Sequence, residues 1–207
     1  MRRPASLLAA CVVPAAVALA EPSAPPTLDG VMAGMASARG VVARFEETKE
    51  VALLRTPLSS RGVLHFVPPD RMVRRTLEPV ASELVIDGDR MWYRDGARSE
   101  PTDLSGEPAA LHFAANFVVL FGGDLEALEE RYETRFEAEG SDWSLHLVPR
   151  DGAVRRFVAE LALRGDGRVM RELAVLEADG DRTITRFLEV DADHEHSPEE
   201  LRELFGR

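Results

Sequence analysis

The sequence predicts a mainly β protein, in which about ten strands form one curled, mostly antiparallel sheet with helices on one face. The first observation behind this prediction is that short segments of alternating apolar and polar residues follow one another through most of the chain. The second is that tight turns rich in Gly, Asp and Pro join most of these segments. A regular alternation of strands and helices, which would indicate a parallel sheet, is absent.

Alternating segments in the first half of the chain predict five strands. They are Val41 to Leu54, Arg61 to Val67, Arg71 to Glu78, Glu83 to Ile86 and Arg90 to Tyr93. The sequence Pro68-Pro69-Asp70 predicts a turn before the third strand, and Asp87-Gly88-Asp89 predicts a hairpin between the last two. In the second half, strands are expected at residues 143–148, 156–164, 169–177 and 182–190. We therefore expect an antiparallel meander with one apolar face.

Four segments predict helices, and one of them, Asp124 to Glu130, is short and acidic. Thr27 to Arg39 places its apolar residues on one face, and Ser197 caps a short helix near the end of the chain. Glu107 to Phe121 differs from both, because only His112 and Asn116 are polar from position 109 onwards. A helix that is apolar on nearly all sides has to be covered on nearly all sides.

The first residues have the pattern of a cleavable secretory signal. Arg2 and Arg3 precede an uncharged apolar stretch, and Ala18-Leu19-Ala20 is a small-x-small cleavage site. We therefore expect residues 1–20 to be a signal peptide, residues 21–26 a flexible leader and residues 27–207 a single exported domain. A competing interpretation is a lipobox at Leu8 to Cys11, which would place a lipid on the cysteine.

Charge and cysteine content exclude several classes of function. The chain has 25 Lys and Arg against 36 Asp and Glu, a net charge of −11, which becomes −13 when cleavage removes Arg2 and Arg3. That balance argues against nucleic acid and anionic lipid surfaces as partners. Cys11 is the only cysteine, so a chain cut after Ala20 has neither disulfides nor thiol chemistry.

The sequence contains no recognisable catalytic motif, neither G-x-S-x-G nor a phosphate-binding glycine loop. His65 and His146 are expected on solvent-facing strand positions, and His112 as a hydrogen-bonded polar group of the apolar helix. His194-Glu195-His196 could hold a metal, but a solvated acidic linker explains it better. No catalytic residue, metal or cofactor is therefore expected.

The predicted helix Glu107 to Phe121 carries more apolar surface than a single packing face would bury. Either strands wrap the apolar helix on both sides, or the helix and the sheet enclose a cavity for an apolar ligand. An acyl chain suits such a cavity, since each buried CH₂ contributes about 0.8 kcal/mol. Burial of a chain of about sixteen carbons then contributes on the order of 10 kcal/mol of binding free energy, before the entropy lost on ordering the chain is subtracted.

Several segments, in order, resemble the LolA family of periplasmic lipoprotein carriers. Phe45 to Lys49 is similar to the F-x-Q-x-K/R start of its first strand, and Arg55 to Phe66 to the P-L-x-S-x-G-x-L-x-F stretch of a divergent branch. Gly123 to Leu128, Trp143 to Pro149 and Gly180 to Thr183 match G-D-x-x-x-L, W-x-L-x-L-x-P and G-D-x-T. The resemblance extends from about Leu28 to Val190.

This resemblance implies an unclosed half-barrel of about ten to eleven strands, whose concave apolar face is covered by helices. It implies a monomeric periplasmic carrier that takes lipoproteins from an inner-membrane transporter and passes them to an outer-membrane acceptor. Two departures allow a different acylated or polyprenyl-like cargo. Pro68 stands where the family has the Arg that helps to hold the lid shut, and Glu47 replaces its Gln.

We therefore expect a carrier of acyl chains. The residues expected to line its cavity are Phe45, Leu64, Phe66, Phe113, Phe117, Val118 and Phe121. The first alternative is a lipid- or lipoprotein-sensing module of the cell envelope on the same fold. The second is a periplasmic hydrolase that uses His112.

Overall fold

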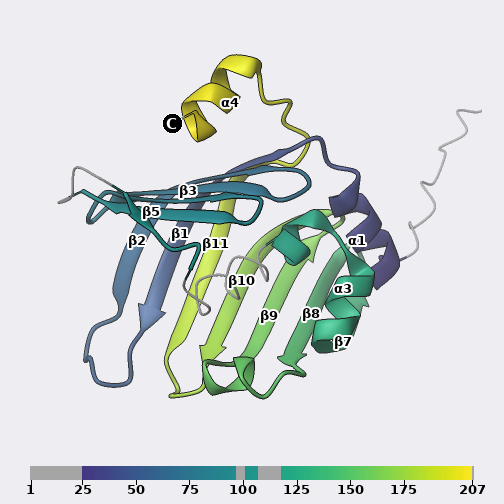
Figure 1. Cartoon of the computed structure of the whole chain (residues 1–207). Helices are drawn as coiled ribbons and strands as arrows, with labels where there is room; N and C mark the ends of the chain where they lie inside the picture. The colour runs from purple at the N-terminus through teal and green to yellow at the C-terminus, as the bar shows by residue number, and fades with distance from the viewer. Residues whose placement is uncertain (1–24, 97–100, 107–117, 207) are drawn as a thin grey trace, which may run out of the picture.

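All the strands that the structure describes belong to one antiparallel sheet. The computed structural model describes residues 25–96, 101–106 and 118–206, and its strands lie in the order β6-β5-β4-β3-β2-β1-β11-β10-β9-β8-β7. The sheet therefore consists of two meanders, β1 to β6 and β7 to β11, joined where the first strand pairs with the last. Its two edge strands, β6 and β7, do not pair, so the curled sheet stays open (Figure 1). This confirms the expected mainly β, unclosed half-barrel.

The first meander occupies the region where five strands were expected. Its strands are β1 (Val41–Glu50), β2 (Leu58–Val67), β3 (Arg71–Glu78), β4 (Ser82–Asp87), β5 (Arg90–Asp95) and β6 (Thr102–Asp103). The prediction for β1 was too long, because the chain leaves the sheet after Glu50. Leu53 and Leu54 lie in the exposed connection to β2.

The second meander contains the strands expected from alternation in the second half, with one more at its edge. Its strands are β7 (Tyr132–Glu139), β8 (Asp142–Pro149), β9 (Val158–Asp166), β10 (Val169–Glu177) and β11 (Arg182–Asp191). A short 3-10 helix, Val154–Arg156, connects β8 to β9. Phe157 directly follows it and is 64% exposed, so the expected start of that strand at residue 156 was too early.

The two faces of the sheet differ in what they bury. We call the face that carries Phe45 and Leu64 the inner face, and the face that carries Val73 and Val85 the outer face. The inner face holds the main hydrophobic core, with side chains from both meanders. Gly62 is needed here, because a Cβ at this position would lie 2.8 Å from the Phe45 ring and would overlap the carbonyl oxygen of Arg75.

Three helical segments cover the inner face. They are α1 (Leu28–Ala36), the described helical residues 118–122 and α3 (Leu125–Arg131). Figure 1 shows α1 and α3 beside β7 and β8. Gly123 brings residues 118–122 against α1: it has φ +67°, and a Cβ there would overlap the carbonyl oxygen of Met32. The predicted helix Glu107 to Phe121 lies outside the described residues as far as position 117.

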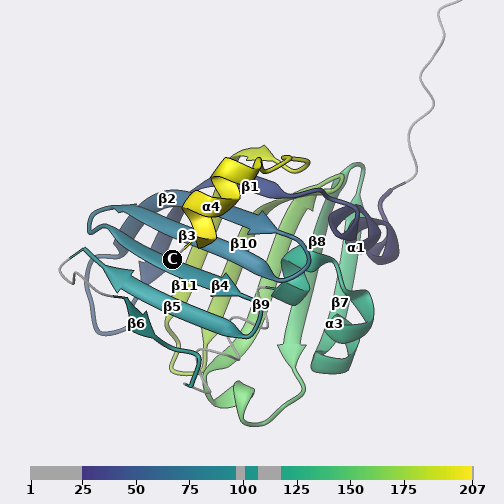
Figure 2. The same ribbon diagram turned by 45° about the horizontal axis from the view of Figure 1, so that its top comes forward.

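The last helix lies on the opposite side of the sheet. Helix α4 (Pro198–Phe205) packs on the outer face, where Leu204 joins Val73 and Val85 in a second small core (Figure 2). Ser197 caps it as expected, through a hydrogen bond with the backbone N–H of Glu200. Both faces of the first meander therefore carry a helical cover, whereas the sequence predicted helices on one face only.

Candidate functional site

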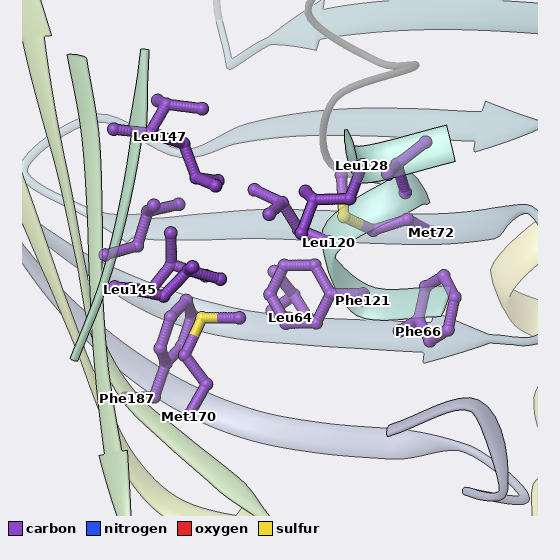
Figure 3. Packing of buried hydrophobic residues seen from close by; sticks show 14 of the residues in the cluster. Leu64, Phe66, Met72, Leu120, Phe121, Leu128, Leu145, Leu147, Met170 and Phe187 are labelled. Atoms are coloured by element: carbon purple, nitrogen blue, oxygen red, sulfur yellow. The ribbon is translucent and has the colours of Figure 1, made fainter. Parts of the chain in front are cut away.

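The inner face is filled by aromatic and aliphatic side chains that meet around Phe121 (Figure 3). The Phe121 ring centre lies 5.8 Å from that of Phe66 on β2 and 5.8 Å from that of Phe187 on β11. Because Phe187 pairs directly with Phe45, the ring of Phe121 lies over the line along which the two meanders join. The helical cover thus places one aromatic side chain in the middle of the curled sheet.

A small apolar cavity lies beside this aromatic cluster. Its volume is about 30 Å³, and it is enclosed by α1, by Phe121 and by the inner-face side chains of β1, β10 and β11. Its lining residues include Met35, Ala38, Ala43, Phe121, Met170 and Phe187. Such a cavity holds about one methylene group, so a whole acyl chain would fit only if the cover moved away.

The residues expected to line the site lie in one cluster as far as the structure describes them. Phe45, Leu64, Phe66 and Phe121 are buried in the main core, and Val118 packs against it. Phe113, Phe117 and the alternative catalytic residue His112 lie outside the described residues. Whether these side chains touch a ligand or only the core stays a prediction.

Several apolar residues of the site were not singled out from the sequence. They are Met35, Met72, Leu145, Leu147, Met170 and Phe187, all on or over the inner face. Except for Met35, which lies on α1, alternation in their strands gives the face to which each side chain points, and this signal could have identified them. It does not show which of them surround one space.

A polar cluster interrupts the apolar inner face on the side of the β1–β2 connection. Glu47 and Arg74 form an ion pair with 2.9 Å between Oε2 and Nη2, and their side chains are only 24% and 20% exposed. The Thr185 hydroxyl donates a hydrogen bond to Glu47 at 2.8 Å, and Arg74 donates one to the Thr76 hydroxyl at 3.1 Å. The Arg74 guanidinium lies 4.1 Å from the centre of the Phe45 ring. We call Glu47, Arg74, Thr76 and Thr185 the inner polar cluster.

A second ion pair continues this polar region towards the end of the sheet. Lys49 and Glu177 are 2.7 Å apart, and hydrogen bonding to Glu177 raises the pKa of Lys49. Glu177 also lies close to Asp179 and Asp181 of the β10–β11 turn. The Asp181 carboxylate accepts a hydrogen bond from the backbone N–H of Ala52, which ties this turn to the β1–β2 connection.

Arg71, the arginine nearest to the position of the lid-holding Arg in the family, points to the outer face. It pairs with Asp87 at 2.7 Å and lies 3.8 Å from the centre of the Phe205 ring of α4. Arg71 therefore fixes the last helix and is directed away from the inner face. Among the arginines of β3, the one directed to the inner face is Arg74.

The structure corrects the expectation for the histidines near α4. His65 is half-buried, and burial lowers its pKa to about 4. In the segment 194–196 Glu195 is exposed, but His194 and His196 are partly buried, and the His194 imidazole lies 3.2 Å from both Asp191 and Glu200. Burial also lowers the pKa of His196. These side chains were misassigned because the sequence did not show that α4 covers the outer face.

The sheet curls without closing, and helices cover its apolar inner face. This arrangement defines a protein built around an internal apolar compartment. No helix within the described ranges has the length and apolar character needed to cross a bilayer. The sequence pattern of the family described as "Outer membrane lipoprotein carrier protein LolA-like" matches residues 20–202. The chain belongs to this LolA-like family, as its resemblance had indicated.

The following three proteins resemble the chain at low sequence identity. An outer-membrane lipoprotein carrier protein from Alkalilimnicola ehrlichii is 30% identical over 139 residues, which are 67% of this chain and 61% of that protein. The match thus spans less than two thirds of the relative's length. A DUF1329 family protein structure from Desulfovibrio piger superposes with a TM-score of 0.52 at 11% identity, covering 82% of this chain and 92% of that one. A LolA superfamily structure from Nitrosomonas europaea gives 0.45 at 11% identity, over 85% and 97%. The similarity to the D. piger structure shows a shared fold alone.

Proposed function

We propose that this protein is a periplasmic carrier that binds acyl chains of lipoproteins, or of related lipids, and shuttles them from the inner to the outer membrane. The observation that carries the proposal is the apolar inner face, on which Phe121 of the cover fills the space between Phe66 and Phe187. Displacing one helical segment would open this space to an acyl chain, which the aromatic and aliphatic walls would bury.

Family membership supports the same proposal, together with the name of the relative from A. ehrlichii. The proposed route starts at an inner-membrane transporter that donates the cargo and ends at an outer-membrane acceptor. It requires that residues 1–20 be removed as a signal peptide and that residues 27–207 act as one domain without catalytic activity. A carrier that is anchored through Cys11 could not travel between membranes.

The test is to purify the protein from the periplasm and identify bound lipids by native mass spectrometry and lipid extraction. We expect acyl-containing species in stoichiometric amounts, and uptake of a fluorescent hexadecanoyl probe by the delipidated protein. If neither bound acyl species nor uptake of the probe were found, the proposal would be wrong. A His112→Ala variant separates it from the hydrolase alternative, because carriage should persist, whereas loss of a turnover activity would favour an enzyme.

A further inference from the structure

The inner face changes from apolar to polar within one step along the strands that join the two meanders. Phe45 on β1 pairs with Phe187 on β11, and both side chains are buried in the main core. Two residues further, Glu47 pairs with Thr185, and two further again Lys49 pairs with Thr183. Residues two apart share a face and lie about 7 Å apart along a strand, so the boundary is sharp.

The polar side of this boundary is built from groups that satisfy one another. The Glu47 carboxylate binds Arg74, Thr185 and, at 3.4 Å, the Ser60 hydroxyl. Lys49 likewise forms an ion pair with Glu177. Arg74 and Lys49 therefore each have an anion beside them, and these two ion pairs offer hydrogen bonds without a net charge.

An apolar face that ends in ion-paired polar groups is complementary to an amphiphile. From this geometry we propose that the site selects acyl ligands with an uncharged polar end, such as an ester or amide, with the tail beneath α1 and the polar end against the inner polar cluster. This inference rests on the proposed lipid-binding function and adds to it an orientation and a chemical class of head group. Amide and ester groups can hydrogen-bond to Arg74, Thr76 and Thr185 without a charge of their own.

An anionic head group would be disfavoured at the same place. A carboxylate would meet the Glu47 carboxylate in a half-buried environment, where like charges repel more strongly than in water. The Arg74 guanidinium would not compensate fully, because the Glu47 carboxylate, 2.9 Å away, already balances its charge. The penalty for such a ligand is therefore set mainly by one residue, Glu47.

Two ligands of nearly equal shape test the inference with the complete protein. N-palmitoyl glycinamide and N-palmitoyl glycinate differ only in an amide against a carboxylate, and each would be titrated against a bound fluorescent acyl probe at about neutral pH. We expect the amide to bind about tenfold more tightly to the wild-type protein, since only the carboxylate brings a charge that no cation of the site is left to balance. Equal affinity, or tighter binding of the glycinate, would overturn the head-group inference while leaving the carrier proposal intact.

A single substitution should reverse the selectivity. Glu47→Gln removes the anion, retains hydrogen-bonding capacity towards Thr185 and leaves Arg74 as a cation without its carboxylate. We expect the glycinate to gain about tenfold in affinity and the amide to change little. Glu46→Gln is the matched control, because Glu46 is the neighbouring residue, is exposed and pairs across the sheet with Arg61 and Arg186. The same gain in both variants would contradict the assigned role of Glu47. Failure of both ligands and of the acyl probe to bind would overturn the lipid-binding function itself, and this inference with it.

Discussion

The imidazole rings of His65 and His196 lie 5.7 Å apart, centre to centre, where helix α4 meets the outer face of β2. Burial is the largest cause of the lowered pKa of each ring. The groups around them have mixed charge: His196, Arg75 and His194 disfavour a proton on His65, whereas Glu200 favours it. A proton on His196 is disfavoured by His194 and favoured by Glu200 and Asp191. The contact between the last helix and the sheet thus depends on neutral imidazoles.

This contact predicts a loss of stability in mild acid. In the unfolded chain, His65 takes up a proton near pH 6.5, but in the folded chain only near pH 4. Between these values the unfolded state binds more protons, so the contribution of His65 to the free energy of unfolding is fully present above pH 6.5 and is lost as the pH falls towards 4. We expect the Tm, measured by circular dichroism, to fall by about 5 °C between about pH 7.5 and about pH 5. A His65→Leu variant should show a smaller fall; an unchanged fall would assign the pH dependence to other groups.

The outer-face core predicts that α4 stabilises the sheet. Leu204 is 5% exposed and packs with Val73 and Val85. Leu204→Ala should lower the free energy of unfolding in urea by about 2 kcal/mol, at the low end for buried leucines because the core that it joins is small. Arg202→Ala, on the exposed side of the same helix, serves as the control and should change it by less than about 0.5 kcal/mol. Equal effects of the two substitutions would refute a packing role for this helix.

Phe121 should show opposite effects on stability and on ligand binding. Phe121→Ala removes the ring between Phe66 and Phe187 and should lower the free energy of unfolding by about 3 kcal/mol. It also enlarges the adjacent cavity, so the affinity for a fluorescent hexadecanoyl probe should be retained or increased. Phe157→Ala, at a ring that is 64% exposed, is the control and should alter stability little. If Phe121→Ala abolished probe binding while the protein stayed folded, the ring itself would be part of the binding wall.

Substitutions at two glycines with the same backbone conformation distinguish the cost of backbone strain from the cost of a clash with a neighbouring helix. Gly123 has φ +67° and Gly140 has φ +63°, but of the two only Gly123 lies against another helix. Gly140→Ala should cost about 1 kcal/mol, since only the left-handed backbone is unfavourable. Gly123→Ala adds a clash with the backbone of α1 at Met32 and Ala36 and should cost at least about 2 kcal/mol more. Urea denaturation of both variants measures the difference. Equal losses in the free energy of unfolding would mean that α1 shifts to accommodate the added methyl group without destabilising the protein.

Alternation in the sequence predicted most strands, because a strand with one buried face repeats its apolar residues with period two. The pattern fails for β3, where Met72 and Val73 are adjacent and both fully buried. Such a strand is buried on both faces, and only the three-dimensional position of α4 explains why. Helix α4 was expected, but its own sequence does not tell which face of the sheet it covers.

The inner polar cluster was hidden for a different reason. Glu47 and Arg74 each look like an ordinary solvent-facing charge in an alternating strand. They meet because β2 lies between β1 and β3 in a register that places Ser60 opposite Glu47 and Leu64 opposite Arg74. Sheet register depends on all pairings at once, so no single segment of the sequence could have predicted this ion pair.

The pairing of β1 with β11 has a consequence for the order in which the protein can fold. Each meander can form from neighbours along the chain, but the seam between Phe45 and Phe187 needs the last strand of the sheet. Contacts so far apart in sequence form late and slowly, because a long loop must close first. If the chain is exported as proposed, a sheet that cannot be completed before its last strand has been made would help to keep it unfolded until it has crossed the membrane.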